Sequence, residues 1–259
     1  MNEYQISFLV DNTLSRSRIG KPLRYLAKKF KCSLRIINIT QNRSAPLNNS
    51  MSVMQVGLIK GDLCQIAAIG IDAELACFVL KAVISEHYTV IGPQIAHHCS
   101  NDIGKRLPQL ATPCHSCWYY AKAHTVLTKF ECLKGLAQLI YPECTDELLL
   151  AFVKREERSS THITQGIAMP HVMFAPIDWV AVGVIRSDTP IDWDSPLGGV
   201  HLAIALVLPT NPSREQIITA TNLTRNMLAE PIAERLLSTR NRIDLQALLM
   251  YASVDLIPR

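Results

Sequence analysis

The stretch 155–171 reads REERSSTHITQGIAMPH, and it decides how the second half of the chain is interpreted. Ile167–Pro170 is a short apolar segment that predicts a strand, and Pro170 removes an amide donor and fixes the angle at which the chain enters His171. A histidine at a strand end is well placed for exposure on a rigid scaffold. One neutral ring nitrogen can then attack phosphorus while a backbone carbonyl holds the other. The alternative is an ordinary surface or helix-starting histidine.

The residues before His171 favour the chemical interpretation. A phosphoryl group in transfer spreads negative charge over three oxygens, so its catalysis is mainly positioning and hydrogen-bond donation. Arg155 offers a permanently charged planar fork, and Ser160 and Thr161 offer hydroxyls on the following loop. The alternatives are a solvated charge at a helix end for Arg155 and a loop cap for Thr161.

The second half of the chain alternates helical and strand patterns. Short apolar runs predict buried strands, and capping residues followed by 3.6-residue periodicity predict helices. Helices around a mostly buried sheet indicate an α/β sandwich. The expected elements are helices at 127–140, 145–158 (Thr145 as N-cap) and after Ser213 (Ile217, Ala220, Leu223 and Met227–Leu228 inward), helices starting at Pro231 and Asp244, and strands at 167–170, 180–185 and 201–208.

The first 90 residues repeat a strand–helix–strand rhythm that predicts a small α+β sandwich. Asp72 is the expected cap of a helix over Ala73–Glu86, whose apolar stripe contains Leu75, Phe78, Val79 and Val83. Prolines and paired polar residues interrupt any periodicity in the stretch that follows. Residues 91–117 are therefore predicted to be an interdomain joint.

The composition describes a globular chain. Of the 259 residues, 48% are hydrophobic and 19% charged, which excludes a disordered or fibrous protein. The net charge of +4 is spread out, without the dense basic patch of a nucleic-acid-binding protein. No segment approaches the ~18–20 apolar residues of a membrane span, and no signal peptide is recognisable. We therefore expect a cytoplasmic protein in which the eight cysteines are reduced thiols.

The residues from about 120 onward resemble the fructose–mannitol type of enzyme IIA of the phosphoenolpyruvate-dependent sugar phosphotransferase system. The resemblance is carried by Arg155-Glu156, Thr161, Gly166-Ile167-Ala168 and Pro170-His171, which are in register with the family motif. It implies an α/β sandwich enzyme IIA domain over 118–259. It also implies that His171 is the phosphoacceptor, that Arg155 stabilises the phosphoryl group and that Thr161 belongs to the site.

The sequence departs from that family at one site position. Members usually have a second histidine at the start of the helix that follows the strand ending here at Pro209. Counting along the sequence from Pro209, the corresponding position is Gln216. Glutamine still donates a hydrogen bond but does not titrate near neutral pH. His162, on the same loop as Thr161, and His201 are alternatives for this role.

Residues 1–90 resemble HPr, the small histidine phosphocarrier protein, which implies an open-faced β-sandwich. Asn12, Leu14 and the Gln55–Leu58 stretch carry the resemblance. The family's acceptor histidine is missing, because the sequence continues Ser15-Arg16-Ser17-Arg18 and no histidine precedes His87. A phosphoserine at Ser15 has too low a transfer potential to recharge a histidine. We therefore interpret this part as a degenerate HPr-like domain with a docking, dimerisation or sensing role.

Cysteines and histidines gather in the joint. Cys99, Cys114 and Cys117, with His98 or its neighbour His97, provide ligand types suitable for tetrahedral zinc, although the spacing fits no familiar zinc finger. Free thiols and a redox-active pair are the alternatives, so the prediction is no metal, with these residues as weak candidates.

The sequence thus predicts a phosphotransferase that accepts a phosphoryl group from phospho-HPr on His171 and passes it to an enzyme IIB, without a cofactor, because the phosphoramidate is itself the energy carrier. A membrane sugar permease would be an indirect partner, and nucleic acid none. The alternatives are a regulatory IIA-like protein, in which phosphorylation of His171 controls partner binding, and a binding module with an idle site. Fructose or mannitol is a family-level expectation for the sugar.

Overall fold

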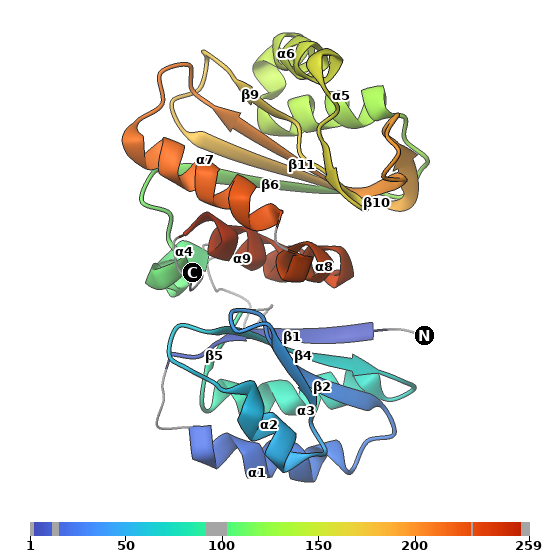
Figure 1. Ribbon diagram of the computed structural model, residues 1–259, viewed down its shortest axis with the longest axis vertical. Helices are drawn as coiled ribbons and strands as arrows, with labels where there is room; N and C mark the ends of the chain where they lie inside the picture. Colours follow the sequence, from blue (N-terminus) through green and yellow to red (C-terminus); the bar gives the residue numbers. More distant parts are fainter. Residues whose placement is uncertain (1–2, 12–15, 92–102, 229, 255–259) are drawn as a thin grey trace. The chain divides into compact units, whose positions relative to one another are not determined.

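The computed structural model describes residues 3–11, 16–91, 103–228 and 230–254 (Figure 1). Its contacts divide the chain into two compact units. Among the described residues, the first unit contains those up to Leu110 together with Ile243–Tyr251, and the second contains Ala111–Arg242 and Ala252–Val254. The bounds 1–90, 91–117 and 118–259 stay a prediction, and this division differs from them in assigning most of the last helix to the first unit. Within the described residues, no helix is both long and apolar enough to cross a bilayer.

The first unit is built on a five-stranded antiparallel sheet of order β3-β2-β4-β1-β5. Helices α1, α2 and α3 cover one face of the sheet, where alternate residues of β1 and β4 pack against them. The elements are β1 (Glu3–Leu9), α1 (Arg16–Ala27), β2 (Ser33–Asn38), β3 (Arg43–Pro46), α2 (Ser50–Val56), β4 (Leu63–Ile69), α3 (Ala73–Ser85), β5 (Thr89–Val90), α4 (Ile103–Arg106) and the 3₁₀ turn η1 (Pro108–Leu110).

The expected apolar stripe of α3 is wrong at Leu75 and Phe78 but right at Val83, which packs against the core, and the expected cap is wrong. The inward face is formed by residues such as Ala76 and Leu80, whereas Leu75 and Phe78 are exposed. The helix is apolar nearly all round, so its sequence does not define a single stripe. Asp72 makes no side-chain cap, because its carboxylate instead accepts a hydrogen bond of 2.7 Å from the Lys31 amide.

The other face of this sheet is also buried. Ser7 and Leu9 of β1 and Leu63 and Gln65 of β4 point away from the helices, yet all are at most 3% exposed. Within the same unit, the Tyr251 hydroxyl donates a hydrogen bond of 2.7 Å to Thr40 Oγ1 beside this sheet. The predicted α+β class is confirmed, with the difference that the face expected to be open is buried in this chain.

The second unit is a sandwich around a sheet of order β6-β10-β11-β8-β7, with β9 also paired to β11. Figure 1 shows α5 and α6 on one face of this sheet and α7 on the other, as an α/β sandwich requires. The elements are β6 (Ser116–Ala123), α5 (Lys129–Ile140), the 3₁₀ turn η2 (Pro142–Cys144), α6 (Thr145–Arg158), β7 (His162–Thr164), β8 (Ile167–Ala168), β9 (His171–Met173), β10 (Val180–Asp192), β11 (Gly199–Leu208), α7 (Arg214–Met227) and α8 (Glu230–Ser238). The last helix, α9 (Arg242–Ser253), belongs mostly to the first unit.

The helix starts of the second unit follow the sequence signals in part. Ser213 caps α7 as predicted, with Gln216 completing a reciprocal capping box. Thr145 is already the first residue of α6, and its hydroxyl donates to the Pro142 carbonyl, so the predicted N-cap is one residue too late. Ile217, predicted to point inward, is half exposed.

Candidate functional site

His171 is placed by two short strands that share one neighbour. β8 pairs in parallel with β11 at Leu202 and Ala203, and β9 pairs with the same strand from Leu206 onward. Between them, Pro170 offers only its carbonyl, which accepts a hydrogen bond of 2.9 Å from the Leu206 amide. His171 is therefore the first residue of a new strand, and it is half-buried rather than exposed as predicted.

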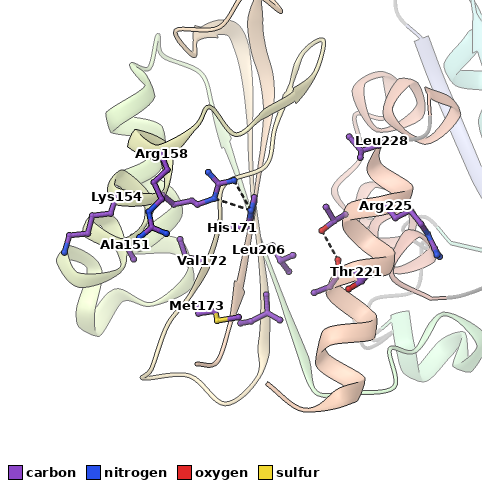
Figure 2. Close-up of a pocket in the computed structure, with 14 residues that line it drawn as sticks. Ala151, Lys154, Arg158, His171, Val172, Met173, Leu206, Thr221, Arg225 and Leu228 are labelled. Carbon is purple, nitrogen blue, oxygen red and sulfur yellow. Dashed lines mark hydrogen bonds between the residues drawn. The ribbon is translucent and has the colours of Figure 1, made fainter. Parts of the chain in front are cut away.

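The partners of the His171 ring define which nitrogen carries the proton. Nδ1 lies 3.0 Å from the Met169 carbonyl oxygen, which can only accept a hydrogen bond. Nε2 lies 3.3 Å from Arg155 Nε and 3.1 Å from Arg155 Nη2, which can only donate (dashed lines in Figure 2). The neutral ring therefore carries its proton on Nδ1 and presents the Nε2 lone pair to the guanidinium group.

Arg155 is held by the same helix end that presents it. It lies in the last turn of α6, and Nη1 donates hydrogen bonds to the carbonyl and the hydroxyl of Ser159 at 3.0 and 3.1 Å. One edge of the guanidinium group is thus hydrogen-bonded to the helix terminus, and the other edge faces the His171 ring. A fixed, permanently charged donor at Nε2 suits an incoming phosphoryl oxygen.

A pocket of about 760 Å³ opens beside the ring. Figure 2 shows His171 between α6, which carries Lys154 and Arg158, and α7, which carries Thr221. Four of the lining residues are cationic and none is acidic, so the pocket favours an anionic group. The lining residues are Ala151, Lys154, Arg155, Arg158, His171, Val172, Met173, Leu206, Leu208, Ala220, Thr221, Thr224, Arg225 and Leu228.

Family models match both units. The model of the phosphoenolpyruvate-dependent sugar phosphotransferase system, EIIA 2, matches residues 122–251, which is half of the chain. The chain belongs to the EIIA 2 family. The model of the HPr component phosphorylation site of the same system matches residues 16–86. EIIA and HPr members of this system are phosphotransferases with phosphohistidine intermediates.

Curated relatives include the multiphosphoryl transfer proteins of Shigella flexneri and Escherichia coli O157:H7. Each is 27% identical over 103 residues, which is 40% of this chain and only 12% of the relative. Among solved structures, nitrogen regulatory protein IIA-Ntr of Neisseria meningitidis is 22% identical with a TM-score of 0.45, covering 52% of this chain and 92% of its own. IIA mannitol of Escherichia coli is 20% identical with a TM-score of 0.38, covering 50% and 94%.

Two predicted site residues of the EIIA unit are engaged elsewhere. Thr161 is 2% exposed, and its hydroxyl and amide both donate to the Glu156 carboxylate. Gln216 is buried in the capping box of α7, where Oε1 accepts from the Ser213 amide and Nε2 donates to the Asp178 carbonyl at 2.7 Å. Neither belongs to the residues that line the pocket, so the structure brings together only His171 and Arg155 of the predicted four.

The two alternative histidines do not line the pocket either. His162 is buried in β7, and desolvation lowers its pKa, which favours a neutral ring. His201 is exposed on β11, where Nδ1 lies 3.4 Å from the Ser187 carbonyl oxygen. The sequence reasoning missed other residues. Arg158 lies one turn after Arg155 on α6, a spacing that could have indicated it, whereas nothing in the local sequence indicates Arg225.

The zinc candidates of the joint are only partly described. Cys99 and His98 lie outside the described residues. Cys114 Sγ donates to Thr219 Oγ1 at 3.4 Å, and Cys117 Sγ lies 3.7 Å from His115 Nε2. Within the described residues no group of three or more potential ligands converges, so metal binding here stays a weak prediction.

Proposed function

We propose that the chain is a phosphoryl carrier in which Nε2 of His171 accepts the phosphoryl group of an HPr-type donor and passes it to an EIIB-type acceptor. The observation that carries the proposal is the orientation of the ring. With Nδ1–H donated to the Met169 carbonyl, the Nε2 lone pair faces Arg155 in a pocket lined by cations.

The transfer follows from these contacts. The lone pair of His171 Nε2 forms the new N–P bond while the N–P bond of the donor phosphohistidine breaks, and its electron pair returns to the donor ring. The Arg155 donors that face Nε2 at rest then bind oxygens of the arriving group and neutralise their charge. The Met169 carbonyl continues to accept from Nδ1–H and thereby stabilises the positive charge on the phosphorylated ring.

The HPr-like unit does not supply the donor histidine in this proposal. Ser15, where the resemblance expects that histidine, lies outside the described residues, and the first histidine of the chain is His87. A separate HPr is therefore required, and the degenerate unit acts in docking or sensing. We further propose a cytoplasmic location and a fructose- or mannitol-type EIIB partner, through which a membrane permease is reached indirectly.

One observation favours a second candidate, a regulatory carrier that holds the phosphoryl group to control partner binding. In the resemblance, the position of Gln216 carries a histidine that contacts the active ring or the phosphoryl group. Both polar ends of the Gln216 amide are used in the helix cap and at Asp178. A site of this kind lacks the second titratable ring for onward transfer and keeps Arg155 as the side chain that contacts Nε2.

The test uses the full chain with phosphoenolpyruvate, enzyme I and HPr, and mass spectrometry detects an acid-labile mass increase of one phosphoryl group. The expected result is modification of His171, lost in His171→Ala and absent when HPr is omitted. Uptake by the alanine variant as efficient as by the wild type would contradict the proposal. Adding a fructose- or mannitol-type EIIB then separates the two candidates, because only a relay component discharges its phosphoryl group onto that partner.

A further inference from the structure

Glu156 is a buried carboxylate beside the site with four polar contacts. Its side chain is 5% exposed, and Oε1 lies 3.2 Å from Lys129 Nζ. The Thr161 amide donates to both carboxylate oxygens, at 3.1 and 3.2 Å, and the Thr161 hydroxyl donates to Oε2. A buried charge is costly unless it is paired and hydrogen-bonded. These contacts therefore fix the carboxylate and, through it, the backbone at Thr161.

The contacts continue from Thr161 to the acceptor ring. The Thr161 carbonyl accepts a hydrogen bond of 2.8 Å from the amide of Met169, which is itself buried. The Met169 carbonyl accepts the Nδ1–H of His171 at 3.0 Å. Glu156 directly follows Arg155 in α6, so neighbouring residues of one helix hold opposite sides of the ring. Arg155 faces Nε2, and Glu156 acts on Nδ1 through Thr161 and Met169.

We propose that Glu156 is a positioning residue for His171. It holds Thr161, and thereby the Met169 carbonyl, in the place that keeps the proton on Nδ1 and the lone pair on Nε2. Glu156 does not line the pocket and does not touch the ring, so it acts only through these intermediates. The expected effect on phosphoryl transfer rests on the proposed function of His171, whereas the effect on the ring does not.

The first measurement is the tautomer of His171 in the full chain labelled with ¹⁵N-histidine, by long-range ¹H–¹⁵N correlation. The wild type is expected to show the Nδ1–H form alone, and Glu156→Gln a mixture with the Nε2–H form. Thr161→Val removes the hydroxyl contact with Glu156 but keeps the amide contacts, and it is expected to shift the tautomer in the same direction. The matched control is Glu157→Gln, an identical change at the next residue, which is exposed. An unchanged tautomer in folded Glu156→Gln or Thr161→Val overturns the proposal.

The second measurement is the phosphorylation rate with HPr as donor. Displacing a reacting group by 1 Å can cost about 10²-fold, so Glu156→Gln is expected to slow transfer about 10- to 100-fold at saturating HPr with an unchanged half-saturating concentration. Thr161→Ser keeps the hydroxyl and should keep the rate. A wild-type rate in Glu156→Gln counts against the proposal. If the tautomer shifts as expected but wild-type His171 accepts no phosphoryl group, the proposed function fails while the positioning role stands.

Discussion

Arg155→Ala tests the electrostatic part of the site most directly. The substitution removes the two donors that face His171 Nε2 and the two hydrogen bonds that hold the fork on Ser159. Losing one preorganised donor at a developing charge typically slows catalysis about 10²–10³-fold, which corresponds to about 3–4 kcal/mol. Arg155→Lys keeps the charge but cannot reach the ring and Ser159 together, so we expect a smaller loss of about tenfold.

The assay is the initial rate of acid-labile phosphate incorporation with excess enzyme I and HPr, so that acceptance by His171 limits the rate. Lys134→Ala is the control, because Lys134 is an exposed cation on α5 outside the pocket lining, and its removal changes the net charge equally. The expected order is wild type equal to Lys134→Ala, then Arg155→Lys, then Arg155→Ala. A rate for Arg155→Ala within twofold of the wild type would refute the reasoning and leave Arg155 as a structural link to Ser159.

Two further predictions concern stability. Burial raises the pKa of Asp244 from its ordinary 3.8 to about 7. The folded chain therefore keeps a proton that the unfolded chain releases, so stability falls as pH rises from about 4 to 7, by about 4 kcal/mol in all. Asp244→Asn should flatten this dependence. Urea unfolding at pH 5 and pH 8 measures the free energy of unfolding, and a difference between the two pH values as large in the variant as in the wild type would disprove the prediction. Gln216→Ala should lower stability by about 1 kcal/mol through loss of the capping box while leaving the phosphorylation rate unchanged. A calorimetric scan and the rate assay check this together, and a large rate loss would return Gln216 to the site.

The sequence by itself determined the local elements of the second unit and the pair at its site. Apolar runs marked β8 and β11, Ser213 marked the start of α7, and Pro170 marked the entry to His171. These signals are local, because capping and strand propensity depend on residues within a few positions. The contact of Arg155 with His171 was also within reach, since a helix end, one turn and two short strands connect them.

Only the tertiary structure decided which polar residues face the pocket and which distant segment of the chain joins the first unit. Thr161 and Gln216 were predicted to be site residues, yet their hydrogen bonds go to Glu156, Ser213 and Asp178. The spacing of Ser213 and Gln216 is that of a capping box, whereas no spacing rule indicates the contacts with Glu156 and Asp178. The hydroxyl of Tyr251 bonds Thr40 across 211 positions. Local periodicity indicates that a helix has an apolar face but carries no information about its partner. That choice depends on the packing of segments distant in the sequence, which the folded chain alone brings together.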